Sequence, residues 1–452
     1  MPEPKLVLSV NESKKLLGLD HLRAFAIIFV MLFHYQFFGH PAWVNKIARF
    51  GWSGVDLFFV LSGFLISGQL FATIAKGKEV SIKEFFIKRF FRIIPPFLVA
   101  VILYFSLLSV REWGHLSPLW KYLTFTLNFG LDLSKYGTFS HAWSLCVEEQ
   151  FYFVLPIMFL LFSYFKIGSK MPYLLIALFI GGFVTRLWSW NHFMEPVLSA
   201  DNYGALWNKY IYYPTYNRLD SLLVGVSIAG LYTFYPSIKE RVNRYCNLVL
   251  LSGIILLAVS YVVCEGYSTY NTTMWGFPLI ALSYGLILAA VVCPASPIYR
   301  FKLYITSKIA MLSYSMYLTH KMVIHVVQNL LENSSLAILL ACLGLFALAA
   351  YSTVQRAKEI GIRKVLGADV LQIVMLIAGD FVKLVVIAAL IAFPIAWLSM
   401  NSWLRSFAYR VNIGWWVFLI VGISATVIAL LSISFQAIRA ANMNPVKSLK
   451  TE

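Results

Sequence analysis

The chain carries little charge for its length, which argues against an ordinary soluble protein. Only 13% of its 452 residues are Asp, Glu, Lys or Arg, whereas a soluble domain contains about 25%. In their place, 60% of the residues are hydrophobic and the mean hydropathy is +0.75. We therefore predict an all-α protein, a polytopic helical bundle that is integral to a membrane.

Acidic residues are especially scarce, with 20 Asp and Glu against 37 Lys and Arg and a net charge of +17. In a soluble protein such an excess would suggest a nucleic-acid partner. Here 24 of the 37 basic residues, counting Lys308 at the first position of the predicted ninth span, fall in tails and loops on one side of the predicted spans and eight on the other. This is the positive-inside pattern, so we predict that both termini are cytoplasmic and that nucleic acid is not a partner.

Cysteine is also rare, and its five copies are scattered through separate apolar segments without metal-type spacing. We therefore expect neither a metal site nor a disulfide framework, and treat these cysteines as small apolar packing residues. The first eighteen residues lack a short apolar core followed by a small-residue cleavage site. The sequence thus predicts no cleaved signal peptide, with the first span serving as the insertion signal.

Long apolar runs are abundant, and twelve of them have the length needed to cross a bilayer. Their boundaries are uncertain by several residues. The shortest is the third. The predicted spans cover residues 20–38, 52–71, 94–110, 141–165, 172–192, 217–235, 246–264, 275–293, 308–330, 336–353, 371–400 and 413–435.

The first span contains an arginine and a histidine, Arg23 and His34, placed eleven residues apart. At about 3.6 residues per turn this is almost three turns, so both side chains point the same way, roughly 16 Å apart along the axis. An ionisable residue inside a bilayer is costly and by default marks a functional site. The pair suits a ligand whose anionic end stays at the surface while its reactive end reaches inward.

The second span combines small residues with a carboxylate. Ser62 and Gly63 are small enough to let another helix approach closely. This structural interpretation is at least as well supported as a catalytic Ser62, because no base lies at a usable spacing on the same helix. Asp56, near the outer end of the span, needs a partner.

A basic segment, residues 81–96, follows this span, and Lys88, Arg89 and Arg92 lie on its neighbouring turns among four phenylalanines. One interpretation is an interfacial helix anchored on anionic lipid. The other is a phosphate clamp, because arginine presents bidentate donors to phosphate. The two are compatible, since both place the segment at the inner membrane surface.

The fourth span opens with a polar stripe at helical spacing, whose members are His141, Ser144, Glu148 and Tyr152. Glu149 points about 100° away from Glu148, so at most one of the two shares the stripe. Carboxylates within a span must be paired or protonated. A purely structural role for them, such as pairing with Arg186 or Arg218, therefore remains open.

Further polar residues begin the sixth span and run through the ninth. Arg218 and Asp220 lie at the outer side of the sixth span, where they could pair with each other and cap the helix. The ninth span carries His320 and His325. A lone histidine in a helix bundle is more often a hydrogen-bonded packing element than a catalyst, so neither is a primary candidate.

Taken together and in order, six of these motifs resemble the acyltransferase 3 family of multi-pass membrane enzymes over residues 17 to about 330. Singly each is weak, but six in order over three hundred residues are specific. The matching segments are the pair Arg23 and His34, Phe58–Ile66, the pair Arg89 and Arg92 before Pro95, Trp143–Tyr152, Arg218–Asp220 and Ser313–His320.

The resemblance implies acyl transfer from a cytoplasmic acyl-CoA to a hydroxyl, usually on a carbohydrate handled at the outer face. By position, it makes His34 the base and Arg23 its partner. Arg89 and Arg92 match the second arginine motif, and Glu148 matches the acidic position of the fourth span. The usual closing helix of the family, with its Glu-x-Pro motif, is absent after residue 330.

The last quarter of the chain resembles something else, the C-terminal portion of FtsX-like permeases. The similarity rests on Cys342–Ala368, on the motif around Asp380 and on the ending Asn444–Lys450. In those permeases the basic loop faces an ATPase subunit. We therefore divide the chain into residues 1–330, an acyltransferase-like membrane domain, and residues 331–452, a permease-like segment of three helices.

We accordingly expect a membrane-bound O-acyltransferase of a bacterial cytoplasmic (inner) membrane. Acyl-CoA, acetyl-CoA in particular, would be the donor substrate, with its phosphates near Arg89 and Arg92; no cofactor would be permanently bound. Glu148 would orient His34 or the acceptor. The sequence is compatible both with direct transfer of the acyl group and with a covalent acyl-enzyme. The carbohydrate acceptor would be extracytoplasmic or lipid-linked, and its candidate ligands are Asp56, His141, Arg218 and Asp220.

The rival interpretation is a non-enzymatic permease subunit of an ABC-type export complex. It rests on residues 335–452. The chain has no Gly-x4-Gly-Lys-Ser/Thr phosphate loop, so any ATP hydrolysis would require a partner ATPase subunit.

Overall fold

The computed structural model describes residues 17–164, 170–301 and 303–330. The chain divides into two units, Met1–Leu340 and Ala341–Glu452, and every described residue belongs to the first. All regular elements among the described residues are helices, which confirms the predicted fold class there. Both termini, the predicted spans 336–353, 371–400 and 413–435, and the permease-like segment lie outside the described residues.

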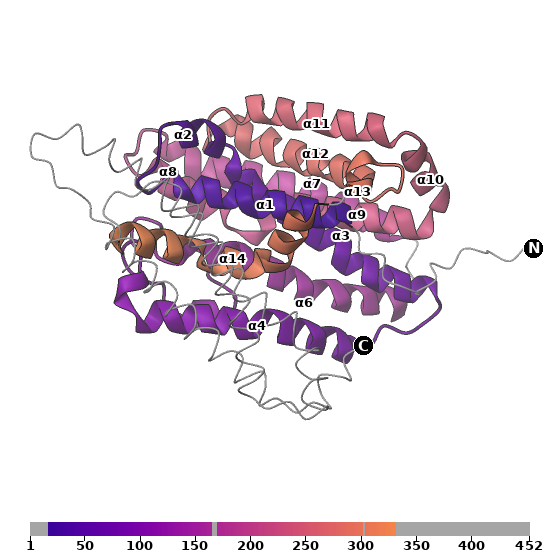
Figure 1. Cartoon of the computed structure of the whole chain (residues 1–452), viewed down its shortest axis with the longest axis horizontal. Helices are drawn as coiled ribbons and strands as arrows, with labels where there is room; N and C mark the ends of the chain where they lie inside the picture. Colours follow the sequence, from indigo (N-terminus) through magenta and orange to yellow (C-terminus); the bar gives the residue numbers. More distant parts are fainter. Residues whose placement is uncertain (1–16, 165–169, 302, 331–452) are drawn as a thin grey trace, which may run out of the picture. The chain divides into compact units, whose positions relative to one another are not determined.

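Long helices run side by side through this unit, joined by short helices at both ends (Figure 1). They follow the apolar runs of the sequence, since a helix satisfies its own backbone hydrogen bonds in lipid. The helices are α1 (Leu17–Tyr35), α2 (Trp43–Ala48), α3 (Gly54–Ala75), α4 (Ile82–Ser106), α5 (Leu119–Leu123), α6 (Trp143–Tyr164), α7 (Met171–Ser189), α8 (Tyr203–Trp207), α9 (Asp220–Phe234), α10 (Pro236–Arg244), α11 (Cys246–Val263), α12 (Phe277–Val291), α13 (Pro297–Arg300) and α14 (Tyr304–Leu330).

Six of the described helices, some with a flanking turn, are long and apolar enough to cross a membrane. The predicted sixth span instead forms α9, which qualifies only jointly with α10, after a bend of 105°. The predicted third and ninth spans are helical, in α4 and α14, but are not among the six. The total of about twelve spans therefore remains a prediction. The six are Gly18–Tyr35, Gly51–Ala75, Ser140–Leu160, Met171–Val197, Cys246–Val263 and Thr272–Val291.

The basic segment and the third predicted span form one continuous helix, α4. Ser81 caps its start, because the side-chain oxygen accepts a hydrogen bond from the Glu84 amide at 3.3 Å. Pro95 and Pro96 lie inside the helix without ending it. The arginines of the basic segment are therefore carried on the same rigid element as the apolar half.

Two glycines bring α3 and α9 into close contact. A Cβ on Gly63 would lie 2.2 Å from the Leu222 carbonyl oxygen, and one on Gly225 would lie 2.2 Å from the Val60 carbonyl oxygen. Real Cβ atoms do not approach backbone this closely, so the two helices touch only because both positions lack a side chain. The predicted packing role of Gly63 is confirmed.

Replacing Gly225 with alanine is expected to destabilise the protein by about 1–3 kcal/mol, because the new methyl group must push α3 and α9 apart. Gly181 in α7 provides a matched control, since a Cβ there would meet no atom within 4 Å. Thermal unfolding of both purified variants checks the prediction. Equal midpoints for the Gly225→Ala and Gly181→Ala proteins would contradict it.

Candidate active site

Three arginines, predicted as the partner of His34 and as a phosphate clamp, line one polar cleft of about 330 Å³. Arg23 comes from α1, and Arg89 and Arg92 come from α4. Side chains of α3, α6 and α14 form the remaining walls. The α1 and α4 motifs, more than sixty residues apart in sequence, thus present guanidinium groups to a common space that could hold an anionic ligand.

Two carboxylates, opposite in charge to the arginines, also line this cleft. Glu148 accepts hydrogen bonds from the Ser62 hydroxyl at 2.8 Å and from the Tyr152 hydroxyl at 3.3 Å. The Arg89 guanidinium lies 5.2 Å from the centre of the Tyr152 ring. Glu149 also lines the cleft. Glu148 is therefore held by neutral hydroxyls, whereas the suggested structural partners Arg186 and Arg218 bind elsewhere.

A cluster of three histidines lies at one end of the bundle. His34 is in the last turn of α1, which ends at Tyr35, rather than in the middle of a span. The ring centres of His34 and His320 are 4.7 Å apart, and those of His141 and His320 are 4.6 Å apart. His141 and His320 are fully buried. We call His34, His141 and His320 the histidine cluster; it draws on three distant parts of the chain.

Hydrogen bonds to backbone carbonyls fix the tautomers in this cluster. The Nδ1 atom of His320 lies 2.7 Å from the Tyr317 carbonyl oxygen, which can only accept, so this nitrogen carries the hydrogen. In a neutral ring, Nε2 of His320 is then an acceptor. It lies 3.1 Å from Nδ1 of His34, which is also 2.9 Å from the Val30 carbonyl oxygen.

It follows that Nδ1 of a neutral His34 donates and that the lone pair of the ring is on Nε2. This assignment comes from the hydrogen-bond pattern. His320, which the sequence favoured as a packing element, is thus the side chain that contacts the candidate base. His325 is different, because it is half-buried and its ring is 2.9 Å from the amide nitrogen of the exposed Asn329.

Tyr317 and Ser144 join the histidine cluster to the polar cleft. Both line the cleft, and their hydroxyl oxygens are 2.5 Å apart. The Tyr317 hydroxyl also donates to the His141 carbonyl oxygen at 2.9 Å. A ligand that fills the cleft therefore ends against the residues that position His141 and His320.

A buried ion pair that the sequence did not reveal lies beside the cluster. Lys321 and Glu112 are 2.9 Å apart, and both side chains are almost fully buried. Lys321 also donates to the Gly137 carbonyl oxygen at 3.2 Å and to the Ser140 hydroxyl at 3.3 Å. Glu112 comes from an irregular segment between helices, where no periodicity marks a residue as buried. Its partner, Lys321, lies within the predicted ninth span, residues 308–330.

The remaining predicted residues form two other buried ion pairs. Arg218 donates to both carboxylate oxygens of Asp56 at 3.0 Å, and Asp220 binds Arg186. Arg218 and Asp220 therefore pair with different partners and not with each other. None of the four lines the polar cleft. Their assignment to acceptor binding stays a prediction, but their contacts serve the joining of α3, α7 and α9.

Among the described residues no group of three or more His, Cys, Asp or Glu is arranged to hold a metal ion. The three clustered rings meet through hydrogen bonds and ring contacts instead. The chemistry available at this site is therefore the binding of an anionic ligand by arginines in the cleft, combined with proton transfer at an imidazole.

Comparison with known proteins places this geometry in context. The model of an acyltransferase domain, acyltransferase 3, matches residues 16–354, and that of the FtsX-like permease C-terminal segment matches residues 334–445, so the two overlap. The chain is 27% identical over 334 residues to O-acetyltransferase OatA of Staphylococcus aureus, with 67% of this chain and 49% of the relative covered.

A second relative, the peptidoglycan O-acetyltransferase OatA of Listeria monocytogenes, is 28% identical over 339 residues, covering 70% of this chain and 50% of the relative. The chain thus spans about half the length of the curated relatives it matches. No solved structure matches it. Since the acyltransferase model covers well over half of the sequence, the chain belongs to the acyltransferase 3 family.

Proposed function

We propose that the protein is a membrane-bound O-acyltransferase that moves an acyl group, acetyl in particular, from cytoplasmic acyl-CoA to a carbohydrate hydroxyl. The observation that carries the proposal is the polar cleft, which is lined by three arginines and by Tyr317. The histidines themselves do not line this cleft, but Tyr317 is hydrogen-bonded to His141 and His320 and so links the anion-binding region to the histidine cluster. The relatives named as O-acetyltransferases support acetyl as the group. The relative named for peptidoglycan supports an extracytoplasmic or lipid-linked glycan as the acceptor.

In the proposed mechanism, Arg89 and Arg92 bind the phosphates of acyl-CoA, and the pantetheine arm runs past Arg23 towards His34. His34 accepts the proton of the acceptor hydroxyl at Nε2 while the hydroxyl oxygen attacks the thioester carbonyl. The new C–O bond forms, the C–S bond breaks, and the CoA thiolate leaves and takes up the proton. These steps describe direct transfer. Through an acyl-enzyme, an enzyme nucleophile would displace the CoA thiolate first, and the acceptor hydroxyl would then give its proton to His34 while it displaces that nucleophile from the acyl group.

His320 has a positioning role in this proposal. By accepting the hydrogen bond of His34 at Nδ1, it keeps the lone pair of His34 on Nε2. Glu148 is bound to Ser62 and Tyr152, so it orients the ligand in the cleft and not His34 directly. His141 packs between Tyr317 and His320, with ring centres 5.7 Å and 4.6 Å away.

The experiment that tests the function uses the full chain, purified in detergent, with acetyl-CoA labelled in the acetyl group and a soluble peptidoglycan fragment. We expect release of the CoA thiol together with a labelled ester on the sugar. Thiol release without an ester would point to a different acceptor, which other glycans then identify. Neither product with any glycan or donor would overturn the proposal.

A second candidate function rests on the match of residues 334–445 to the FtsX-like permease segment. In this alternative, the chain is a permease subunit of an ABC-type export complex and works with a separate ATPase. Co-purification of an ATPase subunit that depends on residues 331–452, in a protein without acyl-transfer activity, would favour it.

The variants Arg89→Ala and Arg92→Ala should raise the apparent KM for acyl-CoA roughly tenfold or more while changing kcat less. Charged hydrogen bonds to phosphates far from the reacting carbonyl stabilise the ground state and the transition state alike. Steady-state kinetics with varied acyl-CoA provide the measurement.

Lys88→Ala is the matched control for these two variants. Lys88 lies on the same helix, is exposed and pairs with Glu84 at 2.6 Å, and it does not line the cleft. Its removal should leave KM unchanged. An unchanged KM in the arginine variants as well would show that the segment is a lipid anchor.

A further inference from the structure

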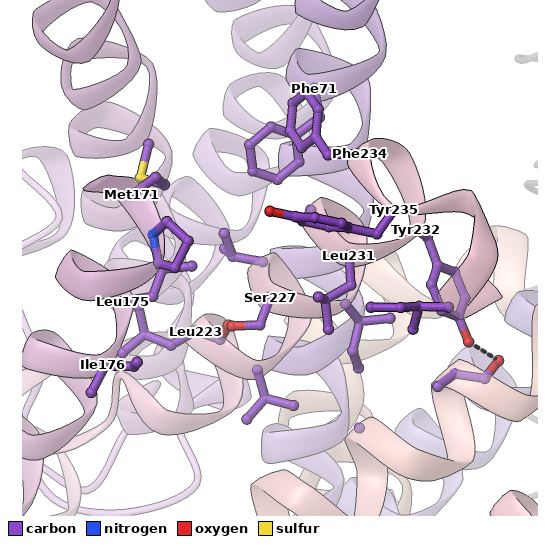
Figure 2. Close-up of a pocket in the computed structure, with 18 of the residues that line it drawn as sticks. Phe71, Met171, Leu175, Ile176, Leu223, Ser227, Leu231, Tyr232, Phe234 and Tyr235 are labelled. Atoms are coloured by element: carbon purple, nitrogen blue, oxygen red, sulfur yellow. Dashed lines mark hydrogen bonds between the residues drawn. The ribbon is translucent and has the colours of Figure 1, made fainter. Parts of the chain in front are cut away.

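A second groove, much larger than the polar cleft, lies elsewhere in the same unit. Its volume is about 1060 Å³, and it shares no lining residue with the cleft. Its walls come from α3, α6, α7, α9, α10 and α12. Figure 2 shows the rings of Phe71 and Phe234 at one end and the side chains of Leu175, Leu223 and Leu231 along its length.

The groove presents mainly hydrocarbon. Of its three hydroxyl groups, those of Tyr232 and Ser227 are bonded to the protein, whereas the Tyr235 hydroxyl points into the groove (Figure 2). The Tyr232 hydroxyl donates to the Ala289 carbonyl oxygen at 2.9 Å, so the ring lines the groove while the polar end faces away (Figure 2). The Ser227 hydroxyl donates to the Leu223 carbonyl oxygen at 2.8 Å. An occupant would therefore gain mainly apolar contacts along the groove, with the Tyr235 hydroxyl as a polar contact.

Cations are concentrated at one end of this groove. Three lining elements each carry an exposed basic residue close to a lining residue: Lys76 follows Ile74 of α3, Lys170 precedes Met171 of α7, and Arg241 precedes Val242 of α10. Segments 76–81, 170 and 236–244 together hold six basic and two acidic residues. None of the six forms an ion pair with another described residue.

Helix α10 contributes both to the apolar lining of the groove and to the basic residues at its end. It turns away from α9 by 105° and places Ile238 and Val242, four residues apart, in the groove lining. Three of its four charged side chains, Glu240, Arg241 and Arg244, are exposed, and Lys239 is half-buried. A short amphipathic helix of this kind lies in the interface between lipid headgroups and acyl chains.

We propose that the groove is a binding site for a phospholipid with an anionic headgroup. The acyl chains fill the apolar groove, and Lys76, Lys170 and Arg241 bind the headgroup at its basic end. A neutral lipid would make the same apolar contacts with the groove but would not neutralise these cations. The positive-inside distribution places this lipid in the cytoplasmic leaflet.

The bound lipid has a structural consequence for α7. Only 11% of the α7 span is buried in the protein, yet Met171 and Leu175 line the groove opposite α9. The acyl chains therefore complete the contact between α7 and the rest of the bundle. A ligand that binds only the folded state raises stability by mass action.

The test uses the full chain purified in detergent and delipidated. Phosphatidylglycerol and phosphatidylcholine of the same chain length are added separately, and native mass spectrometry and thermal unfolding report binding. We expect phosphatidylglycerol to be retained preferentially and to raise the unfolding midpoint. Equal retention of both lipids, or of neither, would overturn the proposal.

Two variants localise the site. Lys170→Gln with Arg241→Gln should reduce the preference for phosphatidylglycerol roughly tenfold or more. A control with two exposed cations on other segments, Lys46→Gln with Lys135→Gln, should not. Ser227→Trp should narrow the groove beside α9 and reduce the retention of either lipid. Unchanged binding in the Lys170/Arg241 variant would exclude the headgroup site, and unchanged binding in a folded Ser227→Trp protein would exclude the groove.

Discussion

Replacement of His34 by alanine is expected to lower the rate of acyl transfer by about 10²–10⁴-fold, the usual contribution of a positioned general base. His34 is the residue of the cluster whose Nε2 is left with a lone pair once Nδ1 is bound to Val30 and His320. The variant should still insert and fold, because the loss of a neutral imidazole ring leaves no buried charge without a partner. Acetyl transfer per mole of membrane protein is the measurement.

His325→Ala is the matched control for this prediction. It removes a half-buried histidine of α14 that lies more than one turn beyond His320 and contacts the exposed Asn329. We expect its turnover to match that of the unmodified protein. A His34→Ala protein with equal turnover would show that the base is elsewhere, and a variant lost from the membrane would point to a structural role.

Replacement of Asp56 by alanine is expected to destabilise the protein by about 3–5 kcal/mol, enough to unfold many proteins. The change leaves the fully buried Arg218 without the carboxylate that accepts two hydrogen bonds at 3.0 Å. Arg218 would keep its contacts with aromatic rings, among them Phe277 at 4.1 Å and Tyr212 at 4.6 Å from the guanidinium carbon, but these do not replace a carboxylate. The yield of monodisperse protein and its unfolding midpoint check the prediction.

A double variant separates a structural role from acceptor binding. Asp56→Leu with Arg218→Met removes both charges and keeps apolar volume, so it should restore most of the lost stability. If the pair serves only to join α3 and α9, the double variant should also retain its KM for the carbohydrate acceptor. A folded double variant with a strongly raised acceptor KM would instead confirm the acceptor-binding role predicted from the sequence.

Local periodicity was sufficient for features that lie on one helix. Arg23 and Arg89 could be expected near a common end, since a span fixes direction and the positive-inside rule fixes the side. The stripe that contains Ser144 and Glu148 follows from helical spacing, and both do line the cleft. The packing role of Gly63 followed from its size alone.

Partnerships between helices could not be obtained in this way. Burial requires that a charge be paired, but it does not say with which partner. Asp56 and Arg218 are separated by 162 positions, so only the contact of α3 with α9 brings them together. Asp220, two residues from Arg218, faces α7 and binds Arg186 instead.

The sequence by itself determined that this protein is helical and rich in membrane-spanning segments, and it determined which residues of each helix share a face. These properties depend on hydropathy and on a fixed helical repeat, both of which are local. The tertiary structure decided that His320 contacts His34, that Lys321 pairs with Glu112, and that an apolar groove opens beside a basic helix. Such contacts depend on which helices pack together, and side-chain packing across the whole bundle sets this choice.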